Sequence, residues 1–159
     1  MEEKLEKPKS VKILQWVYRH LGFFFTILAI FSLVNTIISQ QRLNYGVFTA
    51  ISLGLAILYS YFFKDISQEN FFGKEEQTPL KSQLITLHYA ISTISVGTIV
   101  FTLCLLYIGL RGRNDPGGNW GGIVIAVFLL FLWAISAILI IIGTIFHFIL
   151  KRKLKHFRS

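Results

Sequence analysis

The fold is decided by residues 116–150, PGGNWGGIVIAVFLLFLWAISAILIIIGTIFHFIL, which contain no Lys, Arg, Asp or Glu. Three further stretches share this property, at residues 20–41, 43–63 and 82–110. A helix rises about 1.5 Å per residue and the hydrocarbon core of a bilayer is about 30 Å thick, so about 20 apolar residues cross it. All four stretches reach that length. They predict an all-α membrane protein, a four-transmembrane-helix antiparallel bundle.

We expect a single integral membrane domain over residues 1–159, in which hydrophobic residues make up 53% of the chain. Helices are predicted at about 11–39, 45–63, 80–110 and 120–150, with a cytoplasmic loop at 64–79 and a basic tail at 151–159. The longest segment outside the spans has roughly 20 residues, below the ~40 that an independent soluble core usually needs. The chain also lacks a nucleophile beside an evident base, a carboxylate pair and a phosphate-binding glycine loop. We therefore expect no enzymatic activity.

The formal charge of +8 is concentrated beside the ends of the hydrophobic stretches. If the helices alternate in direction, most cations fall on one side, and the other side receives only Arg42, Arg111 and Arg113. Positively charged loops stay in the cytoplasm, so both termini are expected there. Small size and compact loops favour a bacterial inner (plasma) membrane.

The C-terminal tail is expected to fix this topology and to contact lipid headgroups, because cations near an anionic leaflet are attracted to it. Its basic residues are Lys151, Arg152, Lys153, Lys155 and Arg158. No folded domain accompanies them, so nucleic acid is not an expected partner. The lipid bilayer is the first expected partner.

Small residues recur every four positions along two rows of the second span. The rows are Gly46, Ala50 and Gly54, and Ser52, Ala56 and Ser60. Small residues at this spacing let two helix backbones approach closely. We expect helix packing inside the bundle, with a homodimer face as the alternative.

Histidine is the most suggestive candidate ligand. With alternating helix directions, His20, His88 and His147 come to a similar depth near the inner leaflet. Imidazoles on separate helices of a bundle can bind a transition metal or haem iron. Interfacial histidines more often form hydrogen bonds only, and no pair here has the i, i+3 or i, i+4 spacing of a metal motif. A haem b or metal-binding redox subunit is therefore the alternative, and no cofactor is the main expectation.

Hydroxyl side chains follow the same face of the third span as His88, at steps of three or four residues. They are Ser92, Ser95, Thr98 and Thr102. Ser136, Gly143 and His147 share a face of the fourth span that we expect to meet this stripe. Helix packing is the expected role, and a path for a small solute through a transporter or channel is the alternative. The spans contain no carboxylate or lysine in their cores, which disfavours a pump.

Packing surfaces are thus plentiful while reactive groups are scarce. The sequence favours a non-enzymatic accessory, assembly or regulatory component of a membrane complex, whose partner is another membrane protein or a second copy. The loop at 64–79 carries the apolar pair Phe71 and Phe72. We expect this pair to face a partner, or else to enter the membrane interface.

Overall fold

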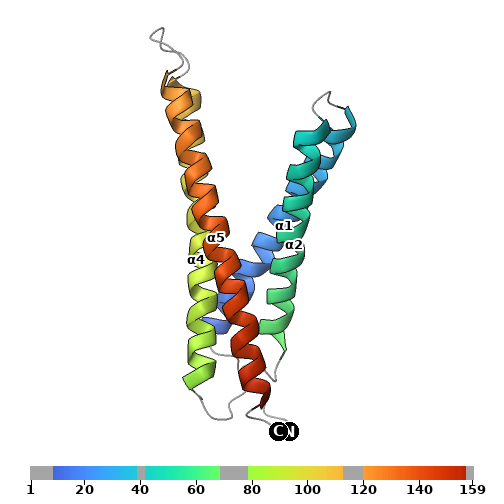
Figure 1. Cartoon of the computed structure of the whole chain (residues 1–159), viewed down its shortest axis with the longest axis vertical. Helices are drawn as coiled ribbons and strands as arrows, with labels where there is room; N and C mark the ends of the chain where they lie inside the picture. Colours follow the sequence, from blue (N-terminus) through green and yellow to red (C-terminus); the bar gives the residue numbers. More distant parts are fainter. Residues whose placement is uncertain (1–8, 39–41, 69–78, 113–119, 157–159) are drawn as a thin grey trace. The chain divides into compact units, whose positions relative to one another are not determined.

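The computed structural model describes residues 9–38, 42–68, 79–112 and 120–156, and the regular structure within these ranges is entirely α-helical. The four helices appear in Figure 1 as α1 (Lys9–Ile38), α2 (Arg42–Ser67), α4 (Pro79–Gly112) and α5 (Trp120–His156). Each contains a stretch long and apolar enough to cross a membrane: Lys9–Ile38, Tyr45–Ser67, Pro79–Gly109 and Gly121–His156. The prediction of an all-helical chain with four such helices is confirmed.

Two helices, α2 and α5, end four or more residues later than the sequence predicts. The second helix is predicted to end near residue 63, but α2 continues to Ser67, and the Gln68 N–H donates to the Lys64 carbonyl at 3.1 Å. The fourth is predicted to end near residue 150, but α5 continues to His156. Charged residues end the stretch that lipid can cover, whereas Lys and Arg are good helix formers and do not end a helix.

The other helix ends differ from the expected positions by three residues or fewer. Pro79 begins α4, a position where its missing N–H costs no hydrogen bond. The expected partner-facing residues Phe71 and Phe72 lie outside the described residues, as does Arg158 of the tail. The basic tail residues Lys151, Arg152, Lys153 and Lys155 belong to the last turns of α5.

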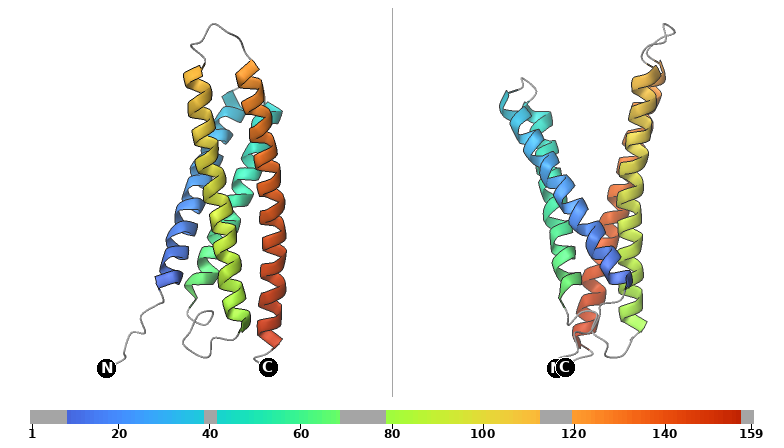
Figure 2. Two further views of the ribbon diagram at one scale, coloured as in Figure 1. Left: turned by 90° about the vertical axis from the view of Figure 1, so that its left-hand side faces the viewer. Right: turned by 180° about the vertical axis from the view of Figure 1, so that it is seen from behind.

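The chain divides into two compact units, residues 1–76 and 77–159. In the first unit, α1 and α2 run antiparallel and side by side (Figures 1 and 2). Aromatic rings fill the contact: Tyr59 of α2 lies between Tyr18 and Phe25 of α1, with ring centroids 5.9 and 5.6 Å apart. These three side chains are buried. The hairpin core is therefore a layered set of rings.

In the second unit, α4 and α5 form another antiparallel hairpin (Figure 2). Here the contact is made by small and polar residues, among them Thr98 with Ser136 and Ile91 with Gly143. Residues later in α4 contact residues earlier in α5, as antiparallel packing requires. Polar residues thus mark the register of this hairpin.

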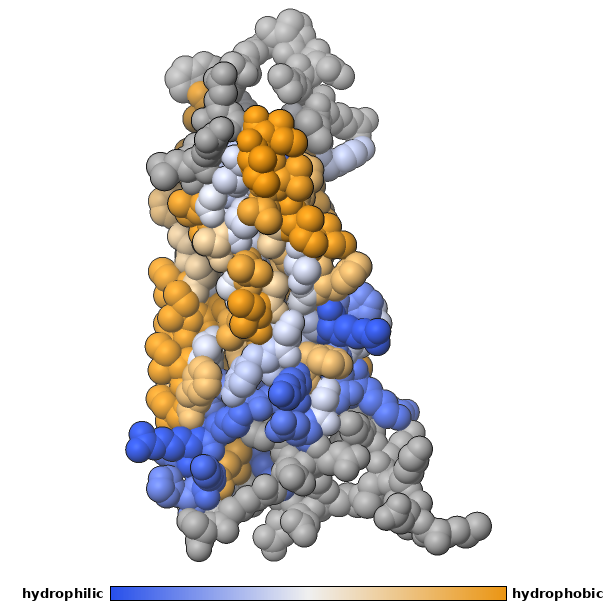
Figure 3. Space-filling view, turned by 90° about the vertical axis from the view of Figure 1, so that its right-hand side faces the viewer, coloured by the Kyte–Doolittle hydropathy of each residue, from blue (hydrophilic) through white to orange (hydrophobic). Residues whose placement is uncertain are grey.

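Large apolar side chains point outward from the helices. In α5, only 6% of the most hydropathic window is buried, and Leu130 and Phe131 are 71% and 66% exposed. Figure 3 shows hydrophobic residues spread over the face that it displays, with hydrophilic residues gathered towards its lower end. In water such a surface would be strongly unfavourable, since apolar area costs about 25 cal/mol per Å² exposed.

Candidate functional site

A buried histidine pair joins α4 to α5. His88 Nε2 and His147 Nδ1 lie 3.1 Å apart, and both side chains are 0% exposed. The ring centroids are 5.0 Å apart and the ring planes meet at 70°. A hydrogen bond at this distance needs one protonated nitrogen and one bare nitrogen, which two neutral imidazoles supply. The pair therefore links the helices by a directional contact.

The distance between these two nitrogens limits which metal group they could hold together. In a zinc site each metal–imidazole bond is about 2.0–2.1 Å long. If both nitrogens bound one such ion at their observed separation, the nitrogen–metal–nitrogen angle would be roughly 100°. Two axial ligands on opposite sides of such an ion would be about 4 Å apart. The observed 3.1 Å separation fits one small ion or a hydrogen bond, and it does not fit haem between these rings.

Two of the three candidate histidines are brought together. His20 lies on α1 in the first unit, is exposed, and places its Nδ1 2.7 Å from the Trp16 carbonyl. Its ring stands 4.1 Å from the Trp16 ring, centroid to centroid. Within the described ranges, no group of three or more His, Cys, Asp or Glu side chains is placed to share a metal ion.

The hydroxyl stripe of α4 continues from the histidine pair along the hairpin. Ser95, Thr98 and Thr102 donate to carbonyls one turn back in α4 at 2.7–2.8 Å. Thr98 Oγ1 also lies 2.6 Å from Ser136 Oγ, and Trp133 Nε1 donates to Thr102 Oγ1 at 3.0 Å. Ser92 donates to the Tyr89 carbonyl at 2.9 Å. The hydroxyls thus bond within the hairpin, and they give a solute pathway no specific support.

Gly143 permits a close approach between α5 and α4. A Cβ at this position would lie 2.8 Å from Ile91 Cγ1 and 3.0 Å from Ile91 Cδ1. The first of these contacts is shorter than real Cβ atoms show and the second is unusually tight, and Ile91 is itself only 1% exposed. Spacing placed Gly143 on the right face of its helix, but it gave no signal for Ile91 as the residue opposite.

The two rows of small residues on α2 have different surroundings. Ser52 and Ala56 are buried. At the same interface a Cβ on Gly22 of α1 would lie 3.4 Å from Ser60 Oγ, an ordinary contact. In the other row, Ala50 is exposed and a Cβ on Gly54 would meet nothing within 4 Å. Gly46 approaches Thr36, at 4.0 Å from its Cγ2.

Three polar contacts of the first unit have no counterpart in the sequence pattern. Ser32 donates to the Tyr45 carbonyl at 3.0 Å and accepts from Thr49 at 2.8 Å. At the other end of the hairpin, Gln15 Nε2 donates to the Ile66 carbonyl at 3.2 Å, and Asp65 is only 4% exposed. Ser32 and Asp65 belong to neither the rows of small residues nor the hydroxyl stripe, so spacing did not single them out.

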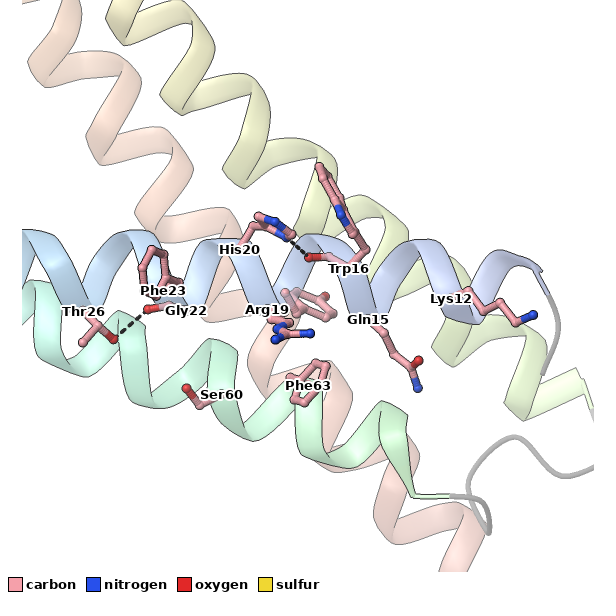
Figure 4. Close-up of a pocket in the computed structure, with 11 residues that line it drawn as sticks. Lys12, Gln15, Trp16, Arg19, His20, Gly22, Phe23, Thr26, Ser60 and Phe63 are labelled. Atoms are coloured by element: carbon pink, nitrogen blue, oxygen red, sulfur yellow. Dashed lines mark hydrogen bonds between the residues drawn. The ribbon is translucent and has the colours of Figure 1, made fainter. Parts of the chain in front are cut away.

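An open groove runs along α1, beside α2 (Figure 4). At one end it is lined by Lys12, Gln15 and Arg19, and at the other by Gly22, Phe23 and Thr26. Ser60 and Phe63 contribute from α2. In Figure 4, Gln15 and Arg19 extend on the α2 side of α1, whereas Trp16 and His20 extend on the opposite side.

Comparisons with protein families, with curated proteins and with solved structures found no match for this chain.

Proposed function

We propose that the chain is an integral membrane protein of a bacterial inner (plasma) membrane, with four spans packed as an antiparallel bundle and both termini in the cytoplasm. The four long apolar helices support the membrane placement. The distribution of Lys and Arg supports the orientation, because positively charged ends are retained in the cytoplasm.

We further propose that the protein acts by contact, as a non-enzymatic accessory, assembly or regulatory component of a membrane complex. The observation that carries this proposal is the outward surface of α5, because only 6% of its most hydropathic window is buried. The polar side chains of Ser136, Trp133 and His147 all form hydrogen bonds to α4 instead. Lipid, the other hairpin of the same chain or the helices of another protein must cover that surface. The partner is another membrane protein or a second copy.

Site-specific photocrosslinking tests the contact role. A photoreactive amino acid at Leu130 or Ile138, which are 71% and 57% exposed, should give one discrete protein adduct in membranes at native expression. The same probe at Ser136, which is 6% exposed, is the matched control on α5 and should give none. Lipid adducts alone at every outward position would contradict a contact function.

The histidine pair supports a second candidate, binding of one transition-metal ion by His88 and His147. It rests on their 3.1 Å nitrogen separation, with the remaining ligands supplied by other donors. Metal analysis of the purified protein should then find a stoichiometric metal that His88→Leu and His147→Leu each remove. His20→Leu is the control and should keep it. Metal-free wild-type protein would leave the pair as a hydrogen bond, and a Soret band would point instead to haem bound elsewhere.

A further inference from the structure

The groove along α1 separates a cationic end from an apolar end. Lys12 and Arg19 are exposed at the cationic end. Asp65 is the single carboxylate among the described residues, and it is only 4% exposed. Arg19 forms no ion pair within those residues. Because a guanidinium stays charged at any physiological pH, this end of the groove attracts an anion.

The other end of the groove suits a hydrocarbon chain. Gly22 packs closely against Ser60 of α2 at this end, and Phe23 supplies the large apolar side chain of the lining. Thr26 donates its hydroxyl hydrogen to the Gly22 carbonyl at 2.8 Å, so this hydroxyl is satisfied within α1. The lining therefore changes from charged to apolar along one helix.

The spacing of the cations also fits the edge of a membrane. Arg19 lies seven residues after Lys12, which is about 10 Å further along the helix axis. An arginine at that depth extends its head back towards the headgroups. Gln15 lies between the two and is held by its bond to the Ile66 carbonyl.

We propose that this groove binds an anionic phospholipid, with its phosphate at Arg19 and Lys12 and an acyl chain along Gly22 and Phe23. Arginine can form two parallel hydrogen bonds to a phosphate, which a lysine cannot. The site rests on the membrane placement proposed above. Its residues belong to α1 and α2, and both the negative charge and the acyl chain of the lipid contribute to its recognition.

Native mass spectrometry of the full chain tests the site after release from nanodiscs made of equal parts phosphatidylglycerol and phosphatidylcholine. Wild-type protein should retain phosphatidylglycerol preferentially. Arg19→Gln should lower the ratio of the two retained lipids about tenfold, which corresponds to about 1.4 kcal/mol. Arg19→Lys should lower it less. Lys64→Gln, which removes an exposed cation of α2 that does not line the groove, should leave it unchanged.

Several outcomes would overturn the site. An unchanged ratio in Arg19→Gln, or an equal fall in Lys64→Gln, would show that no specific groove site exists. Displacement of the lipid by inorganic phosphate would show a general anion site without a lipid requirement. Helix content measured by circular dichroism verifies that each variant is folded. A chain that fails to enter nanodiscs would refute the membrane placement instead, so the two failures are distinguishable.

Discussion

Gly143 is the residue on which the contact between α4 and α5 depends most sharply. Gly143→Ala would place a Cβ 2.8 Å from Ile91 Cγ1. Overpacking of this kind costs about 1–3 kcal/mol, against a gain in helix propensity of up to about 1 kcal/mol. We therefore expect the midpoint for the unfolding of Gly143→Ala in mixed detergent micelles to be lower than that of the wild-type protein.

Gly97→Ala is the matched control for this substitution. A Cβ at Gly97 would meet nothing within 4 Å, so only the gain in helix propensity remains. Adding Ile91→Ala to Gly143→Ala should recover part of the loss, because it removes the opposing atoms. Equal midpoints for Gly143→Ala and Gly97→Ala would show that the two helices are not so closely packed.

The histidine pair predicts a coupling that can be measured. Removing either His88 or His147 leaves the other imidazole without its 3.1 Å partner, and losing one partner of a buried hydrogen bond costs about 1–3 kcal/mol. The shared bond can be lost only once. The double variant His88→Leu with His147→Leu should therefore be less destabilised than the sum of the two single variants, as measured by reversible unfolding in a double-mutant cycle. Strict additivity would mean that the two rings do not interact.

Part of the candidate site follows from sequence spacing alone. Steps of three and four residues place His88, Thr98 and Thr102 on one face of α4, because side chains at those steps stack along a helix. The same logic groups Ser136 with His147 on α5. It does not fix how far one helix slides along the other. The pairing of Thr98 with Ser136 at 2.6 Å is a property of the folded hairpin.

At the scale of the element, hydropathy predicted each helix but not each end. The neutral stretches identify what lipid can cover, whereas a helix ends where its backbone hydrogen bonds end. Lys64 and Asp65 therefore lie within α2, although they follow the neutral stretch at residues 43–63. For the same reason α5 includes Lys151 and Lys153.

Spacing also could not decide which row of small residues on α2 packs against α1. Both rows have a period of four, so they are equivalent in sequence. The ring contacts of Tyr59 with Tyr18 and Phe25 distinguish them, because they turn Ser52 and Ala56 towards α1. Which row of α2 packs therefore depends on the aromatic residues of α1, which the sequence of α2 alone does not show.

The packing of the α1–α2 hairpin predicts different responses to the same substitution at two alanines of α2. Ala56 is 5% exposed and Ala50 is exposed. Ala56→Leu should force the helices apart and destabilise the hairpin by about 1–3 kcal/mol. Ala50→Leu should leave hairpin stability nearly unchanged. Unfolding of both variants in the same micelles measures the difference, and an equal loss in the two would contradict this packing.

Ala50→Leu also tests the homodimer alternative for the row Gly46, Ala50 and Gly54. Close helix packing at small residues is lost when a large side chain is introduced. If this row forms a dimer face, Ala50→Leu should shift the protein from dimer to monomer in sedimentation measurements while the hairpin stays stable. Wild-type protein that sediments as a monomer would exclude a dimer interface at this row of small residues.

At the scale of the whole molecule, charge predicts orientation. Cys104 is the only cysteine in the sequence and is exposed on α4, so Cys104→Ser gives a background without thiols. In that background, Lys153→Cys should react with a membrane-impermeant maleimide only in inside-out vesicles, and Asn114→Cys only in intact spheroplasts. The physical reason is that moving the basic ends of the chain across the membrane is unfavourable. Labelling of both positions from the same side would mean that the chain makes no net crossing of the membrane between residues 114 and 153. That result would contradict a membrane-spanning α5, whose most hydropathic window has a mean hydropathy of 3.1.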